Sequence, residues 1–164
     1  FASYTVGDLV ARVSYINPDQ RVDNLGFGNK EELSVSFDYK VGQFSVGAGY
    51  VSNAGFVEDR EIFGLTSEYA LNDTTNIGLQ YVNFKPGIGD AADEEAGFTL
   101  YGNTKFGDIG VGAFISSSDA NYTEDDIAFG IGASYDLGGA NLAGTIQKGF
   151  LGETYADVGV SFSF

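Results

Sequence analysis

The chain has 164 residues and a formal net charge of −15, from 8 Lys and Arg against 23 Asp and Glu. This acidic balance excludes a basic phosphate-binding face, so we expect no nucleic-acid partner. The chain has neither Cys nor His, which excludes disulfides and thiolate metal sites and removes the commonest general base. Its length suits one domain spanning residues 1–164.

In chain order, segments of alternating polar and apolar residues are separated by tight turns and long polar loops in strict succession. Side chains on a strand alternate between its two faces, so each such segment is predicted to be a strand. We predict eleven strands, at 1–6, 9–16, 33–41, 44–51, 61–71, 76–84, 96–106, 109–116, 127–137, 140–147 and 155–164.

The short connections lie at one end of the predicted sheet and the long connections at the other. Gly7-Asp8, Gly42-Gln43, Gly107-Asp108 and Gly138-Gly139 supply the positive φ of two-residue hairpins. With the turn at 72–75, five tight turns fall at one end of the sheet and five long loops at the other. Outer-membrane barrels show this asymmetry, with short periplasmic turns and longer outer loops.

The two faces of each predicted strand differ in character. In 155–164 one face is apolar, with Val158, Val160 and Phe162, and the other is small and polar. No Lys, Arg, Asp or Glu falls on the apolar face of 33–41, 96–106 or 127–137. A central Lys or Arg on a lipid-facing strand costs roughly 2–4 kcal/mol. The pattern therefore predicts an all-β, antiparallel transmembrane β-barrel, with lipid on the apolar face and water on the polar face.

A tyrosine recurs two residues before the last apolar residue of four strands that end in a tight turn. Tyr prefers the membrane interface because its ring is apolar and its hydroxyl is hydrated. The alternative is that Tyr simply favours strands. The strand at 96–106 lacks the residue and has Thr104 in its place. We predict an interfacial girdle of Tyr4, Tyr39, Tyr69, Tyr135 and the terminal Phe164.

Two segments carry a family resemblance. Residues 132–139 (Gly-Ala-Ser-Tyr-Asp-Leu-Gly-Gly) and 157–164 (Asp-Val-Gly-Val-Ser-Phe-Ser-Phe) resemble the general porins of alphaproteobacteria, the Rhodobacter-type group. Such porins are sixteen-stranded trimers of the outer membrane. The resemblance implies that the eleven strands are the C-terminal part of such a barrel and that N-terminal strands are lacking. The acidic third loop that narrows the pore of this family would lie before Phe1, and Phe164 matches the terminal Phe read by the assembly machinery.

Few charges fall on the polar face of the predicted strands. If that face lines a pore, these charges set the local field and the ion preference. Arg12 is the best candidate for the wall side of a constriction. The alternative is that these are solvated charges with no special role. The predicted pore-lining residues are Arg12, Asp38, Lys40, Glu68 and Lys105.

The long loops carry most of the acidic residues. Clustered carboxylates suit hard cations such as Ca²⁺, and Asp93, Glu94, Glu95 and Asp125 are the candidate ligands. The simpler reading is a hydrated acidic rim. Either arrangement attracts cations at low salt, so we expect a weak cation preference. No other cofactor is expected.

The sequence thus favours an outer-membrane porin, a passive pore for small hydrophilic solutes. Its expected partners are two further copies of itself, outer-membrane lipid and lipopolysaccharide. One alternative is a small structural or adhesive barrel without an open pore, and another is a soluble ligand-carrying barrel with its apolar face inside. We do not expect an enzyme, because the Ser-His-Asp grouping of outer-membrane hydrolases requires a His.

Overall fold

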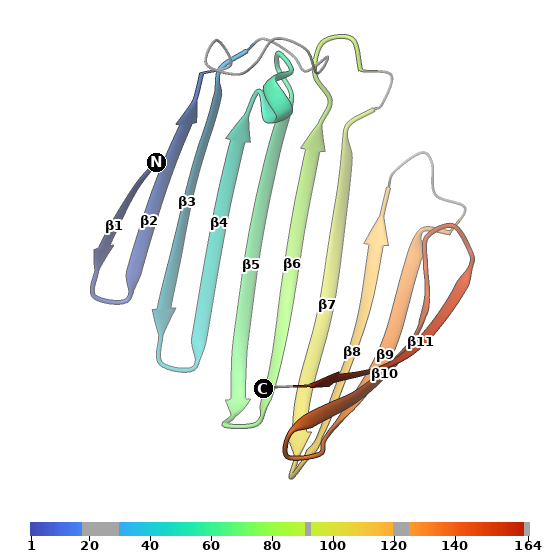
Figure 1. Ribbon diagram of the computed structural model, residues 1–164. Coiled ribbons are helices and arrows are strands. Elements are labelled where there is room, and N and C mark those ends of the chain that lie inside the picture. Colours follow the sequence, from blue (N-terminus) through green and yellow to red (C-terminus); the bar gives the residue numbers. More distant parts are fainter. Residues whose placement is uncertain (18–29, 91–92, 120–124, 163–164) are drawn as a thin grey trace. The chain divides into compact units, whose positions relative to one another are not determined.

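A computed structural model describes residues 1–17, 30–90, 93–119 and 125–162, and Figure 1 shows its strands. Eleven strands lie in one sheet, in the same order as in the sequence. Their bounds are β1 (Ala2–Val6), β2 (Leu9–Ile16), β3 (Glu32–Val41), β4 (Phe44–Ser52), β5 (Glu61–Asn72), β6 (Thr75–Lys85), β7 (Glu95–Phe106), β8 (Ile109–Ser118), β9 (Ile127–Asp136), β10 (Ala140–Lys148) and β11 (Thr154–Phe162).

The chain divides into two compact units. The first comprises Phe1–Ser67 and Gln80–Ala96, and the second comprises Glu68–Leu79 and Gly97–Phe164. β1 to β4 lie in the first unit and β8 to β11 in the second, with antiparallel pairing between successive strands in each. The all-β antiparallel fold and the eleven strands are therefore confirmed. No helix in the described ranges is long and apolar enough to cross a membrane.

The predicted tight turns are confirmed by register and backbone geometry. In the first unit the β1–β2 hairpin closes at Val6 opposite Leu9, with Gly7 at φ 56°. In the second unit the β7–β8 hairpin closes at Phe106 opposite Ile109, with Gly107 at φ 59°. Only glycine adopts this left-handed backbone without a steric cost, so the Gly-x dipeptides marked the turns correctly.

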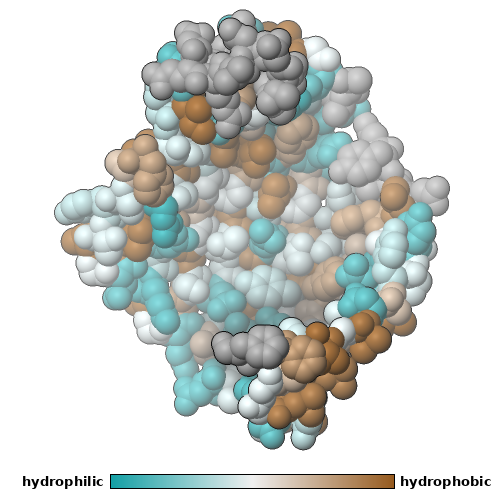
Figure 2. Space-filling view, viewed as in Figure 1, coloured by the Kyte–Doolittle hydropathy of each residue, from teal (hydrophilic) through white to brown (hydrophobic). Residues whose placement is uncertain are grey.

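Exposure alternates along the strands as the sequence pattern predicted, with the apolar side chains outward. On β9, Phe129 is 52% and Ile131 55% exposed, whereas Ala128 between the strand's outward side chains is 5% exposed. Figure 2 shows the apolar side chains of β10 and β11 as a brown area at the lower right. Among the described residues the buried hydrophobic set is only Ala54, Phe56 and Ala128. The sheet therefore presents its apolar face to its surroundings, as a lipid-facing sheet does.

The connection between β4 and β5 differs from the prediction of a plain polar loop. It contains a short 3-10 helix, η2 (Ala54–Phe56), in which both terminal residues are 5% exposed. The helix follows Asn53 at φ 50°, and Phe56 itself has φ 66°. The amide of Gly55 donates to Glu32 Oε2 over 2.8 Å. Strand ends otherwise differ from the predicted bounds by one or two residues.

Candidate functional site

Arg12 and Asp38 form an ion pair on the polar face of the first unit. Val10 lies opposite Asp38 in the β2–β3 register, and Arg12 opposite Ser36, so the two charged side chains share a face. Arg12 Nη1 contacts Asp38 Oδ2, and the two side chains are 42% and 57% exposed. A pair this exposed contributes at most about 1 kcal/mol to stability. Its consequence for a pore is instead that each charge is largely balanced by the other.

The carboxylate of Asp38 lies over a glycine of the neighbouring strand. Gly47 of β4 is opposite Asp38, and a Cβ there would lie 2.7 Å from Asp38 Oδ1 and 2.8 Å from Thr66 Oγ1. Thr66 also donates to the carbonyl of Gly47 over 3.4 Å. Polar groups of β3 and β5 thus meet at Gly47, a position where β4 contributes backbone alone.

Glu68 of β5 is paired in the second unit with a residue that the sequence analysis did not single out. The hydroxyl of Tyr101, on β7, donates to Glu68 Oε2 over 3.2 Å. Tyr101 alternates with the apolar Phe98, Leu100 and Phe106, which placed it on the polar face. The sequence did show an aromatic residue on a face of small polar residues. It did not show that the partner of Tyr101 is Glu68, because that residue lies two strands away.

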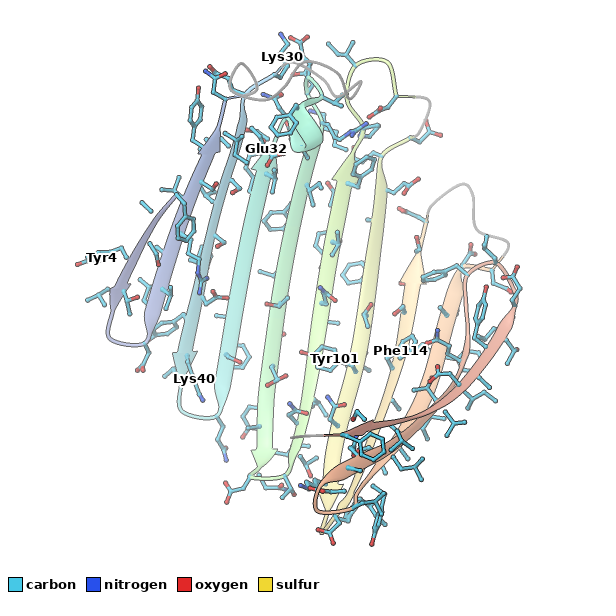
Figure 3. The ribbon with its side chains drawn as sticks, viewed as in Figure 1. Tyr4, Lys30, Glu32, Lys40, Tyr101 and Phe114 are labelled. Carbon is cyan, nitrogen blue, oxygen red and sulfur yellow. The ribbon has the colours of Figure 1, made fainter. Side chains whose placement is uncertain are left out.

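Lys40 and Lys105 lie at the turn ends of their strands. Each is the next-to-last residue of its strand, and neither forms an ion pair with another described residue. Their backbone amides donate to turn carbonyls, Lys40 to Asp8 over 3.2 Å and Lys105 to Thr74 over 3.0 Å. Both ammonium groups are exposed, and Figure 3 labels Lys40 at the end of β3.

Two of the candidate calcium ligands, Glu94 and Asp125, have partners within their own units. Glu94 accepts a hydrogen bond from Asn83 Nδ2 over 3.0 Å in the first unit. Asp125 forms an ion pair with Lys148 over 2.8 Å in the second unit. Within the described ranges there is no group of three or more acidic side chains that could hold a metal ion. Calcium binding by Asp93, Glu94, Glu95 and Asp125 therefore stays a prediction.

The loops of the first unit are joined by a bidentate ion pair. Arg60 donates from Nε to Asp90 Oδ2 over 3.0 Å and from Nη2 to Asp90 Oδ1 over 2.6 Å. The amide of Gly87 donates to the same carboxylate over 2.7 Å. These hydrogen bonds lower the pKa of Asp90. The hydrogen bonds from Arg60 make the largest contribution, and the one from the Gly87 amide makes the next largest. Because Arg60 donates two of these hydrogen bonds to the Asp90 carboxylate, the pKa of Arg60 is raised.

The same loops contain further charged contacts. Lys30 Nζ lies 2.7 Å from Glu58 Oε1, and the amide of Ile88 donates to the carbonyl of Glu58 over 2.9 Å. Asn53 Nδ2 donates to the carbonyl of Glu31 over 2.9 Å. Residues 30–32, 53–60 and 87–90 are thus held together at the loop end of the unit. The acidic rim is therefore partly neutralised by Lys30 and Arg60.

The four predicted girdle tyrosines lie on the apolar face, and Figure 3 shows Tyr4 pointing away from the ribbon. Tyr39 and Tyr135 are each 44% exposed. Tyr39 faces Leu9, and Tyr135 faces Ile109, which is the first residue of the neighbouring strand in both cases. The girdle stays a prediction, and Phe164 lies outside the described residues.

Comparison with known proteins gives a consistent result. Residues 1–149 match the family model described as Gram-negative porin. The chain is 36% identical over 163 residues to a porin of Fuscovulum blasticum, covering 99% of this chain and 53% of that protein. It is 29% identical over 182 residues to a porin of Rhodobacter capsulatus, covering 98% and 60%.

Solved structures give the same relationship. A substituted variant of the Rh. blastica porin aligns with a TM-score of 0.78 at 35% identity, covering 99% of this chain and 53% of that chain. A triple mutant of the Rhodopseudomonas blastica porin aligns with a TM-score of 0.79 and the same coverage. The chain thus spans about half the length of the relatives that it matches.

Proposed function

The chain belongs to the Gram-negative porin family, which places it in the bacterial outer membrane, and we propose that the whole protein forms a water-filled channel there. Small hydrophilic solutes and ions would cross it by passive diffusion. The observation that carries the proposal is the division of each strand into an exposed apolar face and a small polar face. The family is one of channel proteins, not of enzymes.

Selection in such a channel rests on lumen size and on the charges of the polar face. Because Arg12 and Asp38 neutralise one another, they add little net field. Glu68, Lys40 and Lys105 are then among the charges on the described strands that permeating ions would meet. The acidic loops surround the outer mouth and raise the local cation concentration at low salt. We therefore propose a weak cation preference.

The complete assembly is also part of the proposal. Sixteen strands would close the barrel, and three copies would associate through part of the exposed apolar face. Outer-membrane lipid and lipopolysaccharide would cover the remainder. What supports this is the amount of uncovered apolar surface in both units, including Phe37, Leu65, Ile131 and Val160. Neither the fold nor the comparisons support the alternative of a pore-less structural or adhesive barrel.

Reversal potentials across a salt gradient test the preference. The full-length protein in planar bilayers should show a small cation preference at low salt. The preference should shrink at high salt, because the Debye length falls to about 3 Å at 1 M. Anion preference at low salt would contradict the proposed role of the acidic rim. Swelling of protein-containing liposomes in uncharged sugars tests passage of neutral solutes independently of charge.

A further inference from the structure

We propose that Tyr101 is a positioning residue that tethers the carboxylate of Glu68 to the polar face and thereby limits the channel's preference for cations. The inference rests on the proposed channel function and specifies one charge that permeating ions meet. Its first support is the hydrogen bond of 3.2 Å from the Tyr101 hydroxyl to Glu68 Oε2. Both side chains are half-buried and belong to the second unit.

The second support is a glycine that leaves room for the phenol ring. Tyr101 lies on β7 and Glu68 on β5, so the ring crosses β6 at Gly78. A Cβ on Gly78 would lie 2.2 Å from Tyr101 Cζ and 2.4 Å from its hydroxyl oxygen. Gly78 is buried, whereas the flanking Ile77 and Leu79 are each 45% exposed. Glycine weakens a strand interior and often marks the close approach of another group.

A neighbouring aromatic residue shows the same packing without a charged partner. Phe114 of β8 lies opposite Tyr101 in the register, and Figure 3 labels both side chains. A Cβ on Gly130 of β9 would lie 2.7 Å from Phe114 Cε1. Each ring therefore covers a glycine of an adjacent strand. Only the Tyr101 ring carries a hydroxyl, and only that ring reaches a carboxylate. Phe114 is thus the natural control for packing alone.

The hydrogen bond has a definite consequence for ions in the lumen. A glutamate side chain has several rotamers, some of which extend away from the sheet. The donor keeps the carboxylate against the wall and occupies one of its acceptor positions. A unit charge about 4 Å from an ion in water changes the ion's local concentration by about five-fold. Release of Glu68 toward the lumen should therefore strengthen the cation preference.

A double-mutant cycle on the full-length protein tests the tether. The readout is the cation-to-anion permeability ratio from reversal potentials in a KCl gradient. We expect Tyr101→Phe to raise the ratio by about 1.5-fold to two-fold, within the five-fold bound for one nearby charge. Glu68→Gln should lower the ratio. In the Glu68→Gln background Tyr101→Phe should change nothing, because the charge on which it acts is absent.

Three results would overturn the inference. They are an unchanged or lowered ratio in Tyr101→Phe, the same shift in both backgrounds, and an unchanged ratio in Glu68→Gln. Failure of the unsubstituted protein to conduct would instead contradict the channel function itself. The two failures are therefore distinguishable.

A second pair of variants separates charge from ring packing. Gly78→Ala should displace the Tyr101 ring and raise the ratio as Tyr101→Phe does. Gly130→Ala should displace Phe114 and leave the ratio unchanged. Equal changes in both variants would overturn the inference. If Gly78→Ala fails to fold, the cycle with Tyr101→Phe still decides the question, because that substitution removes a single oxygen atom.

Discussion

Gly87 brings two loops of the first unit into close contact. A Cβ at this position would lie 2.5 Å from the carbonyl oxygen of Glu58 and 2.6 Å from Val57 Cγ1. Because one of these neighbours is backbone, Gly87→Ala should force the loops apart and lower the free energy of unfolding by about 1–3 kcal/mol. Heat denaturation in detergent, followed by electrophoretic mobility, measures the loss.

Gly139→Ala is the matched control for that substitution. A Cβ added at Gly139 would have no other atom within 4 Å, and the residue lies in the exposed β9–β10 turn. We expect a change within about 0.5 kcal/mol. Equal destabilisation by the two alanines would show that the close contact at Gly87 is unimportant.

The Arg60–Asp90 pair predicts a pH dependence of the loops. The pKa of Asp90 lies below its ordinary value of 3.8, mainly because of the hydrogen bonds from Arg60. The folded loops therefore favour the carboxylate, and this stabilisation is present above the ordinary pKa. It is lost as the pH falls through the lowered pKa. Arg60, whose pKa is raised, stays charged throughout.

Hydrogen exchange at the amides of Gly87 and Ile88 measures this effect. Their protection should be constant near neutral pH and should fall in acid, below the ordinary Asp pKa of 3.8. In Asp90→Asn the protection should be lower at neutral pH and should lose most of that pH dependence. Nearby Glu58 and Glu61 are paired with Lys30 and Lys85, so this variant separates the contribution of Asp90 from theirs. Protection that is equal in both proteins at every pH would refute the prediction.

At the scale of single residues, the sequence predicted which face of the sheet a side chain occupies better than it predicted which residue that side chain contacts. Arg12 and Asp38 were correctly placed on one face, because side-chain alternation has a period of two. That they form a pair depends on the β2–β3 register, which sequence pattern alone did not supply. The Tyr101–Glu68 hydrogen bond depends on a ring crossing an intervening strand. The position of Tyr101 on a face of small polar residues was visible in the sequence, but its partner was not.

At the scale of elements, the strands were predictable and the loops were not. Alternation and Gly-x turns located all eleven strands to within two residues. The 3-10 helix η2 was missed because it depends on positive φ at Asn53 and Phe56. A bulky residue such as Phe rarely adopts that backbone, so no local pattern indicates it. The burial of Phe56 follows from contacts between segments distant in the sequence.

An arginine should be costly on the apolar face of β10 and tolerated on its polar face. Ile146 lies on the apolar face and is 52% exposed, and Gln147 follows it on the polar face. Ile146→Arg should reduce stability by roughly 2–4 kcal/mol if it lies at the membrane midplane, and by less nearer the interface. Gln147→Arg should be close to neutral. Unfolding in urea from lipid vesicles measures both.

This pair of substitutions also checks the orientation of the sheet. Equal tolerance of the two arginines would show that the apolar face does not meet lipid. A larger cost for Gln147→Arg than for Ile146→Arg would show that the polar face is the buried one. Either result would contradict the assignment of the faces.

At the scale of the whole molecule, strand alternation and the sorting of turns from loops predicted a membrane barrel, whereas the resemblance of residues 132–139 and 157–164 indicated the porin family. The family match confirms that family. The negative field that the acidic loops would produce at the mouth stays a prediction. The extent to which Lys30, Arg60 and Lys148 neutralise that rim was not predictable, because it depends on how loops fold onto one another. The single-domain prediction for residues 1–164 and the assembly into trimers stay predictions.

The most direct test is the conductance of the full-length protein, extracted in detergent and inserted into planar bilayers. An open trimeric pore should give large current steps of nanosiemens order that close in threes. It should remain open in salts of bulky hydrated ions. A folded, heat-modifiable barrel that carries no current would contradict the channel function and would favour the structural or adhesive barrel.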